Sequence, residues 1–190
     1  MDATRTLREE HQLVLKVLSA FESALNTARK SRTVARAVFE PFIEFYRGFA
    51  DRCHHGKEET KLFPCLQRCG MPGDCGPIAV MLEEHRQGRL HVRSMADGLA
   101  AAETGDAAAV DAFLRHGVAF LDLLRNHIGK EDQVLFHIAD EIVQGDTLSQ
   151  LMSSYRDVEQ DREYEQTYQR CRGIADRLVA RGPESDASSA

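Results

Sequence analysis

A motif that occurs twice in this 190-residue chain constrains its fold more than any other feature. The segment HHGKEETKLF at residues 54–63 recurs as HIGKEDQVLF at residues 127–136, so that six residue types coincide at an offset of 73. The tripeptide Glu-Glu-His at residues 9–11 returns at residues 83–85, at an offset of 74. The chain therefore reads as two similar halves, each with a single His followed by a His-x-x-x-Glu motif.

The spacing inside each motif favours a shared binding point. Residues four apart lie on the same face of a helix, so each His-x-x-x-Glu directs an imidazole and a carboxylate the same way. Two such pairs and two single histidines supply four nitrogens and two carboxylates, which is a plausible set for two metal ions. The candidate ligands are His11, His54, Glu58, His85, His127 and Glu131.

Helical periodicity dominates the sequence, and no convincing alternating strand pattern is found. We expect helices over residues 4–29, 33–69, 77–104 and 106–143, with Asp106 as the N-cap of the last. Long helices with short connections predict an all-α fold, an antiparallel up-down-up-down four-helix bundle. Measured from the predicted turns, all six candidate ligands then lie at similar height, within roughly 3–8 Å at 1.5 Å per residue.

The C-terminal part of the chain is more polar. Residues 146–181 are expected to form an accessory helix with a broken apolar stripe, which needs a partner surface. We expect its first half to pack along the bundle and its second half to be weakly held or dependent on a partner. Residues 1–145 would then form the metal-binding bundle, and residues 182–190 a disordered tail.

Helical phase separates the candidate ligands from their neighbours in the sequence. At 100° per residue, His54 and Glu58 fall on an apolar face, whereas His55 and Glu59 are expected to face water. His91 is likewise expected at the surface.

The two carboxylates of the candidate set lie on apolar stripes. Glu58 and Glu131 both occupy positions where an unpaired carboxylate is costly to bury. A metal site explains both residues at once. The alternative for the six residues together is that the duplication merely preserved a packing motif.

Other residues with chemical potential have ordinary interpretations. His116 lies too far along its helix to share an ion with His127, and we expect a core or access-route role for it. Tyr46 is expected in the core or near the metals. We interpret the remaining candidates as structural rather than as a zinc or redox site: His137, Cys65, Cys69 and Cys75.

Composition excludes several classes of function. A formal charge of −6 and the lack of a basic run disfavour a nucleic-acid partner. No apolar stretch approaches the length of about 18 residues that a membrane span needs. Five cysteines in a helical chain without a signal-like start favour reduced thiols, and hence a cytoplasmic protein.

Imidazole and carboxylate without thiolate suit iron or manganese better than copper(I) or structural zinc. In the simplest symmetric arrangement His11 and His54 hold one ion, and a second pair of histidines holds the other. Glu58 and Glu131 would bridge the two ions. An additional oxide or hydroxide bridge would leave a position open on a six-coordinate ion, where a small molecule binds.

The ordered motifs resemble the hemerythrin-like, HHE cation-binding domain family over roughly residues 4–143. They are the run His-x-x-x-Glu-Glu-x-x-Leu-Phe-Pro at 54–64, the Gly-Pro-Ile opening at 76–78 before Glu84-His85, and the motif 127–131. The resemblance implies an antiparallel four-helix bundle around a non-haem di-iron centre, oxo- or hydroxo-bridged, with Mn or Zn as substitutes. It matches at all six candidate ligands, which is the bacterial six-ligand type.

One departure from the family is informative. Oxygen-carrying hemerythrins have a further His four residues after the third-helix ligand, and here that position is Arg89. The resemblance therefore implies an extra open position, and a protein that engages O2, NO or H2O2 in oxygen, nitrosative or oxidative stress sensing or handling. The alternative is a di-iron enzyme, either peroxide-decomposing (catalase-like) or NO-reducing, served by an electron donor. We expect a monomer or a homodimer, and iron storage is disfavoured because nothing suggests a ferritin-like shell.

Overall fold

The computed structural model describes residues 2–180, which are helical almost throughout and contain no strand. The all-α class expected from the periodicity is confirmed. The tail expected to be disordered, residues 182–190, lies outside the described residues. No helix in the described part of the chain combines the length and the apolar character needed to cross a membrane.

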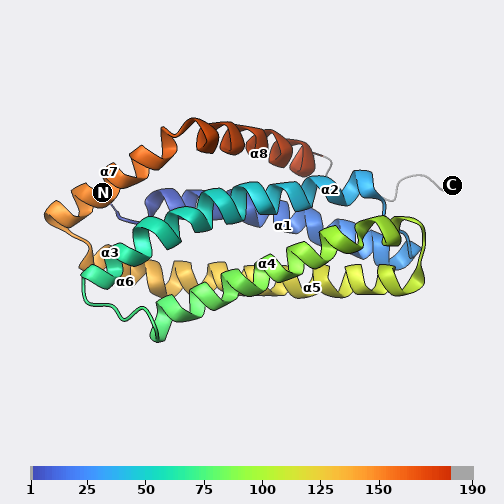
Figure 1. The fold of residues 1–190 in the computed structure, drawn as a ribbon, viewed down its shortest axis with the longest axis horizontal. Coiled ribbons are helices and arrows are strands. Elements are labelled where there is room, and N and C mark those ends of the chain that lie inside the picture. Colours follow the sequence, from blue (N-terminus) through green and yellow to red (C-terminus); the bar gives the residue numbers. More distant parts are fainter. Residues whose placement is uncertain (1, 181–190) are drawn as a thin grey trace.

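Two helical rods form the first half of the chain. The first rod is α1 (Arg5–Ser31), which ends where Arg32 adopts the left-handed conformation with φ of 59°. The second rod runs on without a break in Figure 1 and combines four segments. These are α2 (Arg36–Phe45), η1 (Tyr46–His55), η2 (Glu58–Leu62) and α3 (Phe63–Arg68).

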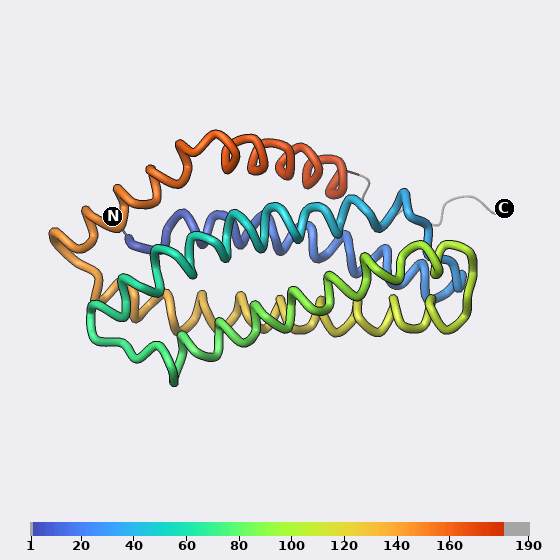
Figure 2. The backbone as a smooth tube through the Cα atoms, in the orientation of Figure 1, coloured from blue at the N-terminus to red at the C-terminus, as the bar shows by residue number. Residues whose placement is uncertain are grey.

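Two further rods form the second half. The third rod is α4 (Gly76–Glu103), and the fourth comprises α5 (Ala107–Lys130), η3 (Glu131–Leu135) and α6 (Phe136–Ile142). The Asp106 carboxylate accepts a hydrogen bond of 2.7 Å from the Ala109 N–H, which confirms the expected N-cap. The rods extend along one another as a helical bundle, in which α5 packs against both α1 and α4 (Figures 1 and 2).

Three segments of the rods are π-helical rather than α-helical: η1, η2 and η3. In a π-helix the backbone bonds span five residues instead of four, so the turn is wider and each residue rotates less about the axis. Such segments are rare in proteins, and those that occur are often found at functional sites. All three lie where the repeated His-x-x-x-Glu motif begins or ends, so the phase of these residues departs from that of an ideal α-helix.

Apolar side chains gather in two buried clusters. The larger is rich in aromatic residues, with Phe21 in edge contact with Phe39, Tyr46 and Phe120. The smaller lies around α3, α6 and the start of α1. On each rod, buried polar residues lie between members of one cluster and members of the other, as on α1, where the order is Leu7, His11 and Val14. The fold therefore encloses a polar layer between two apolar clusters.

The accessory segment forms two helices instead of the single helix expected, α7 (Gly145–Glu159) and α8 (Arg162–Ala180). Asp161 separates them, and its carboxylate accepts a hydrogen bond of 2.9 Å from the Tyr164 N–H at the start of α8. In Figure 1 they run back along the bundle, and they contact η2 and η1 respectively.

Both accessory helices are integrated into the core. Tyr155 of α7 is buried in the smaller cluster, and Cys171 and Leu178 of α8 are buried in the larger one. A Cβ added at Gly48 would lie 2.5 Å from the Cys171 Sγ, so the missing side chain lets α8 approach η1 closely. The expectation that the second half of this segment would be weakly held is therefore wrong.

Candidate metal centre

The polar layer brings together all six side chains that the sequence singled out. The structure buries each of them, with an exposed fraction of 2% or less. Ligand-type atoms of four residues lie within 4.8 Å of one another in each of two groups. The first group is His11, His54, Glu58 and Glu131, and the second is His55, Glu58, His85 and His127.

The two buried glutamates each lie between histidines of the two groups. The Glu58 Oε1 is 3.4 Å from the His54 Nε2, and its Oε2 is 3.5 Å from the His85 Nε2. The Glu131 Oε2 lies 3.3 Å from the His11 Nε2 and 3.2 Å from the His127 Nε2. Glu58 thus belongs to both groups, and the Glu131 Oε2 lies close to one histidine of each.

These atoms are buried but largely without hydrogen-bond partners. In the described residues no partner is found for the Nε2 atoms of His11 and His54 or for any carboxylate oxygen of Glu58 and Glu131. A buried polar atom without a partner costs about 1–3 kcal/mol, and more when it is charged. Imidazole nitrogens and carboxylate oxygens that converge without partners are chemically suited to hold a cation such as iron.

His55 corrects the sequence-based prediction. It was expected to face water, yet its exposed fraction is 7% and its Nδ1 has no hydrogen-bond partner in the described residues. Its ring stacks on that of His85 with centroids 3.8 Å apart. Because η1 extends through His55, the wider π-helical turn keeps both His54 and His55 on the inner side of the rod. A phase of 100° per residue does not capture this arrangement.

A carboxylate and a lysine hold one histidine of each repeated motif. The His54 Nδ1 lies 2.9 Å from the Glu10 Oε2, and the Glu10 Oε1 accepts a hydrogen bond of 2.5 Å from the Lys57 Nζ. In the second half the His127 Nδ1 lies 3.0 Å from the Glu84 Oε2, and the Glu84 Oε1 accepts a hydrogen bond from the Lys130 Nζ.

The other two histidines have the same kind of support from a carboxylate and an arginine. The His11 Nδ1 lies 2.9 Å from the Asp132 Oδ1, which is 3.5 Å from Arg8. The His85 Nδ1 lies 2.7 Å from the Glu59 Oε1, which accepts a hydrogen bond of 2.7 Å from Arg89. The expectation that Glu59 simply faces water is therefore wrong.

These contacts fix the orientation of the four rings. When Nδ1–H donates to a carboxylate, the lone pair resides on Nε2, which is the arrangement that metal-binding histidines use. The sequence contains a signal for these supporting residues, although the sequence analysis gave them no role. They recur at the offsets of the duplication: Glu10 and Glu84, Lys57 and Lys130, Glu59 and Asp132.

Burial and neighbouring charges shift the pKa values of these side chains in different directions. Burial, together with the charge of Glu131, raises the pKa of Glu58 well above its usual value. Burial also acts to raise the pKa of Glu131, but His127 and His11 outweigh it and the pKa is lowered. Burial acts to lower the pKa of His127, yet Glu131 and Glu84 raise it to about 9. A cation that binds Glu58 and His127 must therefore displace their protons, whereas Glu131 is already ionised.

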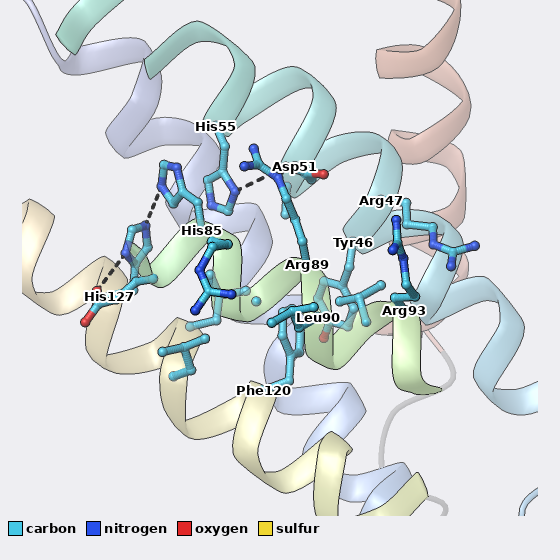
Figure 3. A pocket seen from close by; sticks show the side chains of 17 residues that line it. Tyr46, Arg47, Asp51, His55, His85, Arg89, Leu90, Arg93, Phe120 and His127 are labelled. Carbon is cyan, nitrogen blue, oxygen red and sulfur yellow. Dashed lines mark hydrogen bonds and ion pairs between the residues drawn. The ribbon is translucent and has the colours of Figure 1, made fainter. Parts of the chain in front are cut away.

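A cavity of about 400 Å³ reaches the centre from the side (Figure 3). Its lining includes His55, His85 and His127 at one end and Tyr46 and Phe120 along its wall. Tyr46 thus combines the two roles considered for it, because it packs in the aromatic cluster and also faces the space beside the histidines.

The remaining histidines lie outside both groups. His91 and His116 face each other, with their Nδ1 atoms 3.0 Å apart, so His91 is partly buried rather than fully at the surface. The His137 Nδ1 contacts the Asp132 carbonyl at 2.9 Å.

The cysteines form no cluster with metal-binding geometry. Cys65 is buried, whereas Cys69 and Cys75 are exposed, and all three are free thiols. Within residues 2–180, neither group of potential metal ligands contains a thiol.

An all-helical bundle with a buried layer of histidines and carboxylates defines a class of cation-binding protein. The model of the hemerythrin HHE cation-binding domain matches residues 2–139, and the chain belongs to this family. Resemblance to this family, inferred from the motifs, is thereby confirmed.

The curated relatives do not extend this assignment. The chain is 21% identical over 160 residues to an uncharacterized protein of Mycobacterium bovis and to uncharacterized proteins of two strains of Mycobacterium tuberculosis. The match covers 84% of this chain and 62% of the length of each relative. No solved structure matches the chain.

Proposed function

We propose that the chain is a non-haem di-iron protein that engages O2, NO or H2O2 at an open metal position, in sensing or handling of oxygen, nitrosative or oxidative stress. The observation that carries this proposal is the set of buried nitrogens and oxygens that converge without hydrogen-bond partners. When bound, two iron ions would supply redox chemistry and a coordination position for the small molecule. Mn or Zn would be substitutes.

The ligand roles follow from the two groups of side chains. His11 and His54 would hold one ion, and His85 and His127 the other. Glu58, whose oxygens face one histidine of each group, would bridge the ions, and Glu131 would do the same. The distances support this assignment, which metal analysis of variants must test.

His55 is proposed as a seventh donor. The resemblance implied a six-ligand site because Arg89 replaces the additional His of oxygen-carrying hemerythrins. His55 belongs to the same group as His85 and His127, although it comes from a different rod. We propose that it compensates for Arg89, which instead supports His85 through Glu59.

The organisation of the chain supports the same proposal. We propose that the rods form an up-down-up-down four-helix bundle, which would be the metal-binding part over residues 1–145, and the course of the rods in Figure 1 supports this proposal. Residues 146–181 would be an accessory segment that covers one side of it. We propose a cytoplasmic monomer or homodimer that needs neither a nucleic acid nor a membrane.

Access supports binding of an external small molecule. The cavity joins the outside to the group that contains His55, His85 and His127, so a ligand reaches one ion without unfolding of the rods. Catalysis is the second candidate function, because a cavity larger than a diatomic molecule leaves room for a substrate and a product. The enzyme would decompose peroxide or reduce NO, with an electron donor for the latter.

The first experiment is metal analysis and absorption spectroscopy of full-length protein expressed with ample iron. Two irons per chain and a ferric absorption that shifts on addition of azide are expected. Fewer than about one iron per chain would contradict the proposal.

A second experiment separates binding from catalysis. The reduced protein is mixed with O2, NO or H2O2 under stopped flow, and the spectrum and the products are followed. A reversible spectral change without product supports binding or sensing, whereas sustained consumption of peroxide or NO supports the enzyme.

A further inference from the structure

The cavity beside the histidines is far larger than a diatomic molecule or peroxide requires. Its volume is about 400 Å³. Sites for organic ligands span about 300–1,000 Å³, whereas one water in the liquid occupies about 30 Å³. The space therefore matches an organic molecule of modest size.

The two ends of the cavity are lined by different kinds of side chain. His55 and His85 lie at the inner end, and in Figure 3 Arg47 and Arg93 lie on the side away from His127. Six apolar side chains also line the cavity: Ala50, Leu90, Val92, Phe120, Leu123 and Leu124. The carboxylates of Asp51 and Glu84 line it as well, and each is paired with a basic side chain, Asp51 with Arg89 and Glu84 with Lys130.

Two of the arginines at this cavity lack an acidic partner. Arg86 is paired with Glu83 at 2.6 Å, and Arg89 with Asp51 at 2.7 Å. Among the ion pairs found in residues 2–180, none involves the other two lining arginines, which come from η1 and α4: Arg47 and Arg93.

An unpaired guanidinium offers a planar set of donors that matches a carboxylate. Arg47 and Arg93 lie at one end of the cavity and concentrate positive charge there. The chain as a whole has a formal charge of −6, so the rest of the protein repels anions. The ligand that complements this lining has a single anionic head and an apolar body.

We propose that the cavity binds a monocarboxylate with an unbranched apolar body, the head pairing with Arg47 and Arg93. Arg93 lies eight residues after His85 on α4, which corresponds to about 12 Å along the helix and suits an acyl chain on the order of eight carbons. The body lies along Phe120 and Leu124, and its far end faces the histidines. Contact of that end with a metal rests on the proposed function, whereas binding of the carboxylate does not.

The test is calorimetric titration of octanoate into the full-length protein, both iron-loaded and after removal of iron by chelation. Saturable binding is expected in both states. The double variant Arg47→Gln/Arg93→Gln is expected to weaken it about tenfold or more, because two charge-assisted hydrogen-bond partners are lost. The control Arg29→Gln/Arg115→Gln changes the net charge equally, away from the cavity, and should bind as the unmodified protein does.

Two further measurements separate the head from the body. Acetate lacks the apolar body and octan-1-ol lacks the charge, so both should bind at least about tenfold more weakly than octanoate. Leu90→Glu places a carboxylate on the apolar wall at a side chain that is 48% exposed, where folding tolerates it, and should abolish octanoate binding.

The outcomes also separate this inference from the metal proposal. Iron-loaded protein that shows no saturable binding of octanoate, or equal affinity in the Arg47→Gln/Arg93→Gln variant, overturns the carboxylate site alone. Protein that holds no iron but binds octanoate in an arginine-dependent way supports the carboxylate site while the metal proposal fails.

Discussion

The two halves of the duplication build the same inner surface but have different surroundings. His54 and His127 each contact a glutamate that is paired with a lysine of the same motif. Lys57 is 1% exposed and is covered by Glu159 of α7, at 3.2 Å, whereas the side chain of Lys130 is 44% exposed. The repeated motif therefore determines which atoms meet at the centre, and the later helices determine how far each half is sealed from water.

The halves also differ by one side chain that faces the centre. His55 follows His54, whereas the equivalent position after His127 is Ile128, a buried member of the larger apolar cluster. The extra imidazole of the first half belongs to the group that contains two histidines of the second half. Each half thus contributes residues to both candidate metal-binding groups, so neither half contains a whole group by itself.

The largest expected effect is on the residues that join the halves. Glu58→Ala and Glu131→Ala are each expected to abolish dinuclear binding, because a bridging carboxylate holds both ions whereas a terminal histidine holds one. Iron per chain and the ferric absorption are the measurements. His91→Ala, outside both groups, should retain its iron. Two irons and an unchanged spectrum in either glutamate variant would refute the bridging assignment.

Truncation after Gly145 tests how far the bundle depends on the helices that seal its first half. Loss of buried side chains such as Tyr155, Ile174 and Leu178 should lower the free energy of unfolding by on the order of 5 kcal/mol, at about 1.5–3 kcal/mol each. Iron should remain bound because no candidate ligand lies beyond Glu131. Thermal unfolding and metal analysis check both statements, and a truncated protein that holds no iron would place the accessory helices within the metal-binding unit.

The two lysines provide a matched pair of substitutions. Lys57→Met leaves the buried Glu10 without its cation and is expected to cost about 3–5 kcal/mol of stability. Lys130→Met removes an exposed lysine, and about 0–1 kcal/mol is expected. Denaturant unfolding of the two variants measures the difference. Equal losses would mean that the accessory helices do not isolate Lys57 from water in solution.

The last expected effect belongs to the unmatched histidine, and it concerns the affinity for a single ion. His55→Ile makes the first motif read like the second and is expected to weaken binding of one of the two ions about tenfold or more, the scale of effects around metal sites. The measurement is competition for iron with a chelator. Ile128→Val, a small change at the equivalent position, serves as the control. If His55→Ile retains the affinity of the unmodified protein, His55 packs beside the centre without binding metal.

The helices and the meeting of the six side chains were predictable because both depend on spacing. Residues four apart share a face over most of each rod, and the distances from the turns placed His11, His54, His85 and His127 at one height. The burial of His55 was not predictable in the same way, because it depends on η1. A π-helical segment, in which the backbone hydrogen bonds span five residues instead of four, has no periodic signature in the sequence.

The accessory segment shows a second limit of sequence reasoning. Its interrupted apolar stripe indicated a partner surface but not which one. Docking of α8 depends on Gly48, some 120 residues earlier in the chain, where the lack of a side chain admits Cys171. A contact of this kind is set by shape between distant elements, so no local pattern reports it.

The carboxylates behind the histidines have a consequence for the exchange of protons with water. The side chains of Glu59, Glu84 and Asp132 are 27%, 15% and 26% exposed, so the Nδ1 protons of three rings lie one acceptor away from solvent. The fourth acceptor, Glu10, is 3% exposed and lies beneath Lys57. The Nδ1 proton of His54 should therefore exchange with solvent more slowly than those of the other three rings, which makes this one imidazole a reporter of opening at the accessory helices.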